Sequence, residues 1–242
     1  MKRTEIFSLL LSLLLLSCSE RKTESSLPFY NTLDFTPEWI SPADKAYAGI
    51  HRIAPFSFRN QDSIVIGNEQ VKGRICVVNF FFTTCGSICP RMMRNLRKVD
   101  SSFANDGRIR ILSHTVLPQS DSVARLRDYG QRRGIDSRRW WLLTGRKEEI
   151  YHLARTSYFA DDSLGYGAGN TDFLHTENCV LVDGEGRLRG VYNATLELEM
   201  DQLIGHIRQL LREQDERSGD QSTTSFPFRY SGRMLAKSGV RQ

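Results

Sequence analysis

Two cysteines four residues apart stand where a largely apolar segment meets the expected start of a helix. Cys85 and Cys89 follow the strand pattern Ile75–Phe82, and Pro90 occupies a position typical of the first turn of a helix. The positive end of that helix favours thiolate, the form of cysteine that attacks disulfides and binds soft metals. The pair therefore predicts two sulfur ligands for a soft metal, or a dithiol–disulfide couple. An inert structural disulfide is a weaker explanation, because so short a loop would gain little stability from a bridge.

The composition fits one sizeable α/β domain with an extension at each end. The chain has 242 residues, of which 40% are hydrophobic and 25% charged, and its formal net charge is +5. The arginines are scattered along the sequence and do not alternate with aromatic residues, so we expect no nucleic-acid binding. A diffuse attraction to an anionic membrane surface is a better explanation of the positive charge.

The N-terminus has the pattern of a bacterial lipoprotein signal. Lys2 and Arg3 precede an apolar run from Ile6 to Leu16, which is too short to span a bilayer. The run ends at Ser17 and Cys18, similar to the site at which a lipoprotein cysteine is lipidated. We therefore expect a signal peptide at 1–17, a lipid anchor on Cys18 and a domain that faces the periplasm; the alternative is an ordinary signal with a chance cysteine. Disulfides can persist in that compartment.

The rest of the chain alternates strand and helix patterns. Residues 18–54 are polar and contain prolines, and they predict a tether followed by a loosely docked segment. Residues 56–58 and 63–66 predict a hairpin, and the stripe of Met92, Leu96, Val99 and Phe103 predicts an amphipathic helix. Further strands are expected at 108–114, 140–143, 178–182 and 187–192, and further helices at 120–133, 147–158 and 195–211. Residues 214–242 predict a disordered tail.

This order of elements describes a thioredoxin-like α/β domain over residues 55–213, with a central mixed sheet flanked by helices and an N-terminal hairpin extension. A cysteine pair between a strand and a helix is the sequence cue for that fold.

Three motifs resemble those of the Sco/SenC family, the thioredoxin-fold copper proteins tied to cytochrome c oxidase assembly. They are FTTCGSICP at 82–90, WLLTG at 141–145, and DFLHT at 172–176 before the apolar strand VLVD at 180–183. The resemblance extends over roughly residues 56–211. There is one departure: Leu117 stands where the family pattern S-V-D-P-x-x-D has its first acid.

The resemblance implies a copper site made of Cys85, Cys89 and His175. In a thioredoxin-like sheet, His175 would enter the strand antiparallel to the cysteine-bearing strand, and two sulfurs with one nitrogen could hold both Cu(I) and Cu(II). Asp172 could orient the His175 imidazole as a carboxylate partner. Cys179 falls near the same end of the sheet and could add a fourth ligand, although a core thiol is the simpler expectation.

The remaining candidates are expected to be structural. Cys76 should be a buried thiol that does not pair with Cys179, and Met92 and Met93 should fill the core. The other histidines are His51, His114, His152 and His206, and only His114 is placed near the carboxyl end of the sheet.

The implied function is that of a membrane-anchored copper metallochaperone, which would deliver copper to the binuclear copper centre of a cytochrome c oxidase subunit. Such a protein would also need a periplasmic thiol reductant as a partner. The alternative is an enzyme, a thiol–disulfide oxidoreductase that acts on periplasmic cysteines through Cys85 and Cys89.

Overall fold

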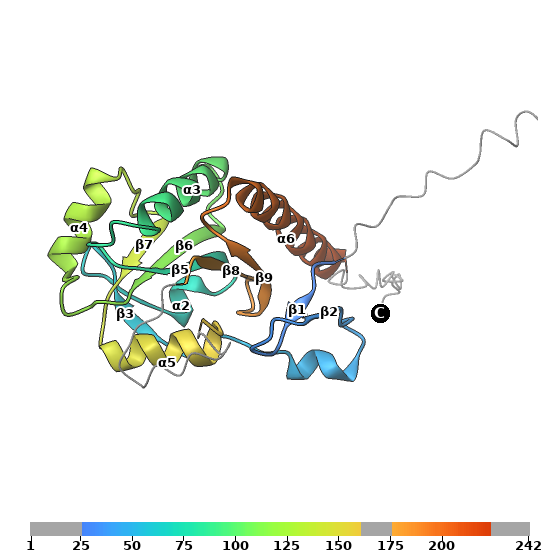
Figure 1. The fold of residues 1–242 in the computed structure, drawn as a ribbon. Helices are drawn as coiled ribbons and strands as arrows, with labels where there is room; N and C mark the ends of the chain where they lie inside the picture. The colour runs from blue at the N-terminus through green and yellow to red at the C-terminus, as the bar shows by residue number, and fades with distance from the viewer. Residues whose placement is uncertain (1–25, 161–175, 224–242) are drawn as a thin grey trace, which may run out of the picture.

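A five-stranded mixed sheet forms the centre of the domain (Figure 1). The computed structural model describes residues 26–160 and 176–223, with side chains up to residue 218. The strand order is β7-β6-β5-β8-β9. The strands are β5 (Ile75–Phe81), β6 (Ile109–Thr115), β7 (Trp140–Leu143), β8 (Asn178–Val182) and β9 (Leu188–Asn193). β5, β6 and β7 are parallel, whereas β8 pairs antiparallel with β5 and with β9. The predicted mixed sheet is thus confirmed.

β5 is the central strand, and all seven of its residues are buried. Its side chains alternate between the two faces of the sheet, so Val77 and Phe81 join one apolar core while Val78 and Phe80 join the other. A strand covered on both faces needs apolar side chains in both directions, which explains its nearly continuous hydrophobic pattern.

Helices cover both faces of this sheet (Figure 1). α3 (Cys89–Ser102), α4 (Val123–Arg132) and α6 (Glu197–Thr223) contribute to the core on one face. α5 (Lys147–Ser157) contributes to the core on the other face. The predicted apolar stripe of α3 is confirmed, because Met92, Leu96 and Val99 are completely buried.

The predicted hairpin is also present. β3 (Ser57–Arg59) pairs antiparallel with β4 (Val65–Gly67), and the short helix α2 (Asn68–Val71) follows. The Arg59 and Thr144 backbones exchange two hydrogen bonds of 2.9 Å, which join this hairpin to the end of β7.

The N-terminal segment is packed more firmly than the sequence predicts. It contains β1 (Phe29–Tyr30), β2 (Pro37–Glu38) and the 3-10 helix η1 (Lys45–Gly49), and Leu27 is buried. The cause lies in β9 and the turn before it, which bury two arginines. The Arg189 guanidinium donates hydrogen bonds to the carbonyls of Leu27 and Pro28, and Arg187 donates one to the Tyr47 hydroxyl. Buried guanidinium groups need such acceptors, so the segment completes the domain.

Two helix boundaries differ from those expected. Ser122, rather than Ser120, caps α4, since its hydroxyl accepts a hydrogen bond from the Arg125 amide. α6 continues to Thr223, so the disordered tail predicted at 214–242 is wrong for residues 214–223. Arg108, which follows α3, binds Asp215 in this last part of the helix at 2.6 Å and gives it a tertiary contact.

His114 is completely buried on the face of the sheet opposite α3. Rings of Phe56, Phe58, Phe80 and Tyr158 surround its imidazole at centroid distances of 5.4–6.2 Å. Among the described residues, neither ring nitrogen has a hydrogen-bond partner. Burial lowers the pKa of His114 to about 3, so the ring is neutral at physiological pH.

His114 should therefore make the fold acid-sensitive. The pKa of His114 in the folded protein lies below the ordinary value of 6.5. Its contribution to the free energy of unfolding is therefore fully present above pH 6.5 and is lost as the pH falls toward 3. Between pH 6.5 and 5 the loss should be roughly 2 kcal/mol. Denaturant titrations of a His114→Leu variant should lack this part of the pH dependence. A His152→Gln control, at an exposed site, should keep it; identical pH profiles for parent and His114→Leu would contradict the assignment.

Candidate metal centre

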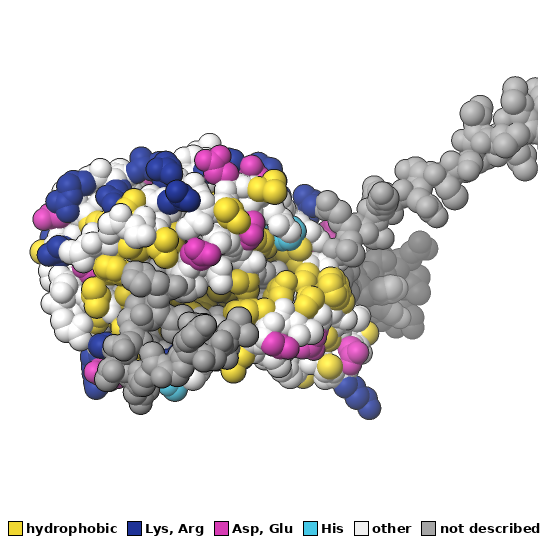
Figure 2. Space-filling model, viewed as in Figure 1, with side chains coloured by type: hydrophobic (Ala, Val, Ile, Leu, Met, Phe, Trp, Pro, Cys, Tyr) yellow, Lys and Arg dark blue, Asp and Glu magenta, His cyan; other side chains and the backbone are white. Residues whose placement is uncertain are grey.

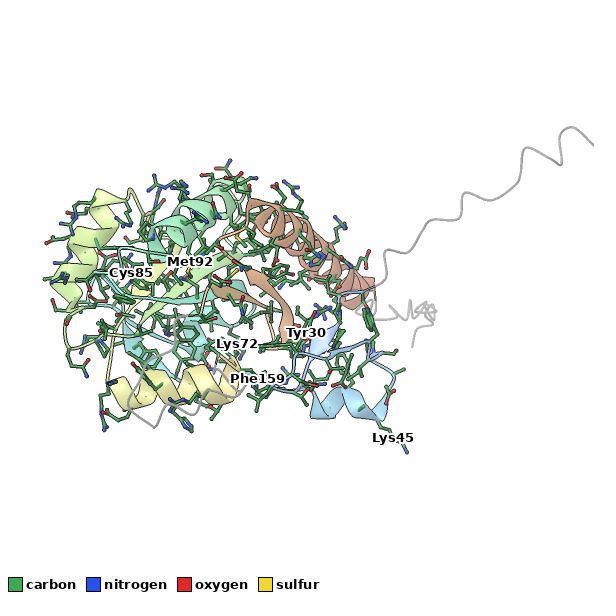
Figure 3. The ribbon with its side chains drawn as sticks, viewed as in Figure 1. Tyr30, Lys45, Lys72, Cys85, Met92 and Phe159 are labelled. Carbon is green, nitrogen blue, oxygen red and sulfur yellow. The ribbon has the colours of Figure 1, made fainter. Side chains whose placement is uncertain are left out.

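Cys85 and Cys89 lie where the chain leaves β5 and enters α3. Cys89 is the first residue of α3, with Pro90 next to it, and Cys85 lies in the preceding loop. Figure 3 shows Cys85 at the end of the sheet, near Met92 in the first turns of α3. Cys85 is 8% exposed and Cys89 is 2% exposed, while Thr84, Gly86 and Ser87 around them are exposed. Both thiols are free. The pair thus lies just beneath an accessible loop.

The two thiols have unequal acidity. Burial raises the pKa of Cys85, but hydrogen bonds from the Cys89 thiol and from the amides of Cys89, Ser87 and Ile88 outweigh it, so the pKa falls below the ordinary value. Burial and the hydrogen bond to Cys85 raise the pKa of Cys89 to about 12. Cys85 is therefore the more acidic thiol of the pair, and Cys89 is the thiol that donates to it.

Asp121 fixes the start of the cysteine loop, a role that the sequence analysis did not assign. This carboxylate is completely buried and accepts hydrogen bonds from the Thr83 amide at 3.1 Å and the Thr83 hydroxyl at 2.5 Å. It also accepts one from the Thr115 hydroxyl, at the end of β6, at 2.5 Å. Asp121 thereby joins the chain two residues before Cys85 to the neighbouring strand. The sequence did offer one indication of this role, because Asp121 occupies the second acidic position of the S-V-D-P-x-x-D pattern.

Cys179 belongs to the core beneath the pair. It is completely buried, and its register partner on β5 is Asn79, two residues before the end of the strand. Burial raises the pKa of its thiol, with a smaller contribution from Glu199. The structure gives Cys179 the environment of a core thiol, as expected.

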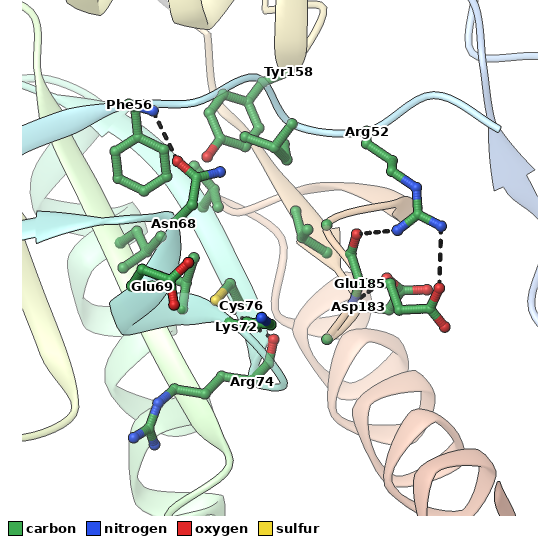
Figure 4. A pocket seen from close by; sticks show the side chains of 17 residues that line it. Arg52, Phe56, Asn68, Glu69, Lys72, Arg74, Cys76, Tyr158, Asp183 and Glu185 are labelled. Atoms are coloured by element: carbon green, nitrogen blue, oxygen red, sulfur yellow. Dashed lines mark hydrogen bonds and ion pairs between the residues drawn. The ribbon is translucent and has the colours of Figure 1, made fainter. Parts of the chain in front are cut away.

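Cys76 lies far from this end of the sheet. It faces a cavity of about 380 Å³ that Asn68, Tyr158 and Asp183 also line (Figure 4). Its register partner on β8 is Val182, three residues from Cys179, so the two thiols do not pair. Burial raises the pKa of Cys76 to about 12. Cys76 is a buried structural thiol, as expected.

His175, Asp172 and Cys18 lie outside the described residues. The chain re-enters the described structure at Thr176, and β8 begins at Asn178. Because β8 is antiparallel to β5, its first residues lie at the end of β5 from which the cysteine loop departs. Within residues 26–160 and 176–223, no three His, Cys, Asp or Glu side chains are grouped as a metal site.

The other histidines and the methionines have structural surroundings. The His51 ring bonds the Ser157 carbonyl at 2.9 Å, and the His206 ring bonds the Tyr192 hydroxyl at 2.7 Å. His152 is exposed, and Met92 and Met93 are buried in the core beside α3. In the described part of the chain, no helix is both long enough and apolar enough to cross a membrane.

The unequal thiols predict a measurable order of reactivity. In reduced, copper-free protein, iodoacetamide should modify Cys85 before Cys89, Cys76 and Cys179, and its pH midpoint should lie below that of an ordinary thiol, because only Cys85 has a lowered pKa. Peptide mass spectrometry measures each rate. A Cys89→Ala variant should react more slowly at Cys85 at neutral pH because the thiol donor is lost. Cys89→Ser, which keeps a donor, is the matched control; equal rates in the two variants would rule out the hydrogen bond as the cause.

This chain is similar in sequence to known proteins. The family model described as SCO1/SenC matches residues 45–212. The chain is 27% identical over 160 residues to the SCO1 protein homolog of Bacillus subtilis (strain 168), covering 65% of this chain and 82% of that protein. It is 26% identical over 144 residues to a protein of Stutzerimonas stutzeri that is named for copper binding, covering 58% of this chain and 68% of that protein.

Among solved structures, the fold matches BsSco, described as a member of the Sco family of cytochrome c oxidase assembly proteins with a disulfide switch. The TM-score is 0.57 at 26% identity, over 66% of this chain and 94% of the other. The shared fold, the cysteine loop and the extent of the family match lead to one conclusion: this chain belongs to the SCO1/SenC family.

Proposed function

We propose that the protein binds copper through Cys85, Cys89 and His175 and delivers it to the binuclear copper centre of a cytochrome c oxidase subunit. The observation that carries this proposal is the free cysteine pair under an exposed loop, in which hydrogen bonds lower the pKa of Cys85. Two thiolates suit Cu(I), and a histidine nitrogen would allow the site to hold Cu(II) as well. The relatives named for SCO1 and for copper binding support the same cargo.

The position of β8 supports His175 as the third ligand. His175 directly precedes Thr176, where the described structure resumes, and the first residues of β8 lie at the cysteine end of the sheet. Asp172, three residues earlier, would be available to hold the imidazole in the tautomer that binds metal. Copper would then pass to the partner by ligand exchange, which an exposed loop permits.

Thiol–disulfide exchange is a second candidate, and the unequal acidity of the pair favours it. The Cys85 thiolate would attack a substrate disulfide and release one substrate thiolate, forming a mixed disulfide. The Cys89 thiol, after losing its proton, would attack Cys85, release the second substrate thiol and leave a Cys85–Cys89 disulfide. A thiol reductant would then restore the pair.

Copper titration separates the two candidates. Competition against a Cu(I) chelator should give tight one-to-one binding by the reduced protein, and Cys85→Ser, Cys89→Ser and His175→Ala should each weaken it at least tenfold, because each removes one of three ligands. Cys76→Ser and His152→Ala are matched controls that should bind like the parent. Binding that is indifferent to His175 would contradict the proposed ligand set, and disulfide reduction by the parent without tight copper binding would favour the enzyme.

We further propose that Cys18 is the lipid anchor and that the domain faces the periplasm. The short apolar run before Cys18 supports this. In cell fractionation, the parent protein should sediment with membranes, and Cys18→Ser should appear in the soluble periplasmic fraction or keep an uncleaved signal. Cys76→Ser should fractionate like the parent. Membrane association of processed Cys18→Ser would show that another feature anchors the chain.

A further inference from the structure

We infer that exposed arginines on α3 and α4 form a docking surface for an acidic protein partner beside the cysteine pair. This arginine face consists of Arg91, Arg94, Arg97, Arg125 and Arg132. The inference rests on the proposed function for the identity of the partner, the oxidase domain that receives copper.

The arginine face is assembled by folding. On α3, Arg91, Arg94 and Arg97 recur every three residues on the exposed side, opposite the buried stripe. On α4, Arg125 and Arg132 are two turns apart and therefore share a side of the helix. The two helices adjoin, since a Cβ built on Gly134 after α4 would lie 3.3 Å from Nη1 of Arg97. Figure 2 shows Lys and Arg side chains gathered over α3 and α4.

The face has a positive charge that the domain does not neutralise. Four of its arginines have no acidic partner among the described residues: Arg91, Arg94, Arg97 and Arg132. The fifth, Arg125, donates to the Thr83 hydroxyl at 2.8 Å and lies 3.9 Å from Asp121. Several arginines elsewhere are paired with acids, for example Arg139 with Asp100 at 3.0 Å. Exposed cations without local partners are free to attract an anionic surface.

The face adjoins the candidate metal centre. Arg91 is two residues after Cys89 in α3, and Arg125 and Arg132 line a hollow of about 430 Å³ whose wall includes Thr83, two residues before Cys85. A protein docked on this face would bring its own ligands to the cysteine loop. Among the described residues that line the hollow, Asp128 is the single acid.

A protein partner explains the face better than a membrane does. β1, near the start of the described chain, lies at the opposite end of the domain from α4 (Figure 1). A domain anchored through Cys18 can thus present the arginine face away from its anchor. Complementary charge would accelerate encounter and orient the partner, with ligand exchange at the cysteines following.

The test measures association between the full-length reduced, copper-free protein in detergent and the copper-free soluble domain of the oxidase subunit that holds the binuclear copper centre. Stopped-flow or biolayer measurements at 20 and 200 mM salt would be made on Arg94→Glu/Arg97→Glu. The control Lys45→Glu/Lys72→Glu changes net charge equally at exposed residues outside α3, α4 and the loop that holds Cys85.

The face variant should associate about tenfold more slowly at low salt and lose most of the salt dependence. The control should behave like the parent. The variant Arg94→Lys/Arg97→Lys keeps the charge and should also associate normally. That result would show that the slower association of the face variant comes from the lost charge and not from a folding defect. Equal rates for the face and control variants, or no association by the parent, would overturn the inference.

Two further measurements keep the outcomes distinct. Chelator competition for Cu(I) on the same preparations should be unchanged in all variants, so a failure of copper binding counts against the proposed function and not against the docking surface. Vesicles containing phosphatidylglycerol test the membrane: if the face variant loses vesicle binding but still associates with the oxidase domain normally, the face binds lipid and the inference is overturned.

Discussion

The structure depends on the burial of β5 between two apolar layers. Each of its seven residues is buried, with Val77 and Phe81 packed under α3 and α6, and Val78 and Phe80 packed on the opposite face. β6 and β8 bond its two edges. A strand held on four sides has a fixed end point, and the cysteine loop starts there. The position of Cys85 and Cys89 therefore follows from the most constrained part of the core.

The loop beyond β5 has its own restraints, and these create the chemistry. Asp121 binds the amide and hydroxyl of Thr83 and also the end of β6, so the chain enters the loop in a defined direction. Amides near the start of α3 then point at Cys85 and stabilise its thiolate, while burial keeps Cys89 protonated. Neighbouring thiols with different pKa values suit both a metal that displaces protons and stepwise disulfide exchange. This explains why both functions remain chemically reasonable for one pair.

Two buried arginines determine how the N-terminal segment packs against the β9 edge of the sheet. Arg187 and Arg189 are almost completely buried, and both bind Asp183, at 2.8 and 3.3 Å. One acid cannot satisfy two guanidinium groups, so Glu185 accepts from Arg187 and Glu213 from Arg189. The N-terminal segment supplies further acceptors, the Leu27 and Pro28 carbonyls. The segment that begins the described chain is consequently part of the domain, although its sequence is polar and rich in turn residues.

The sequence by itself determined the elements with strong periodic patterns and the residues that carry the chemistry. The apolar run of β5, the stripe of α3 and the strands β8 and β9 can each be predicted from the local sequence, because the period of apolar side chains distinguishes buried strands from amphipathic helices. The cysteine pair and its junction with α3 were evident for the same reason. Only the tertiary structure decided the role of Asp121, the firm packing of residues 27–54 and the gathering of scattered arginines on α3 and α4. These features depend on contacts between residues distant in sequence, such as Thr83 with Asp121 and Leu27 with Arg189, and no local pattern encodes such contacts.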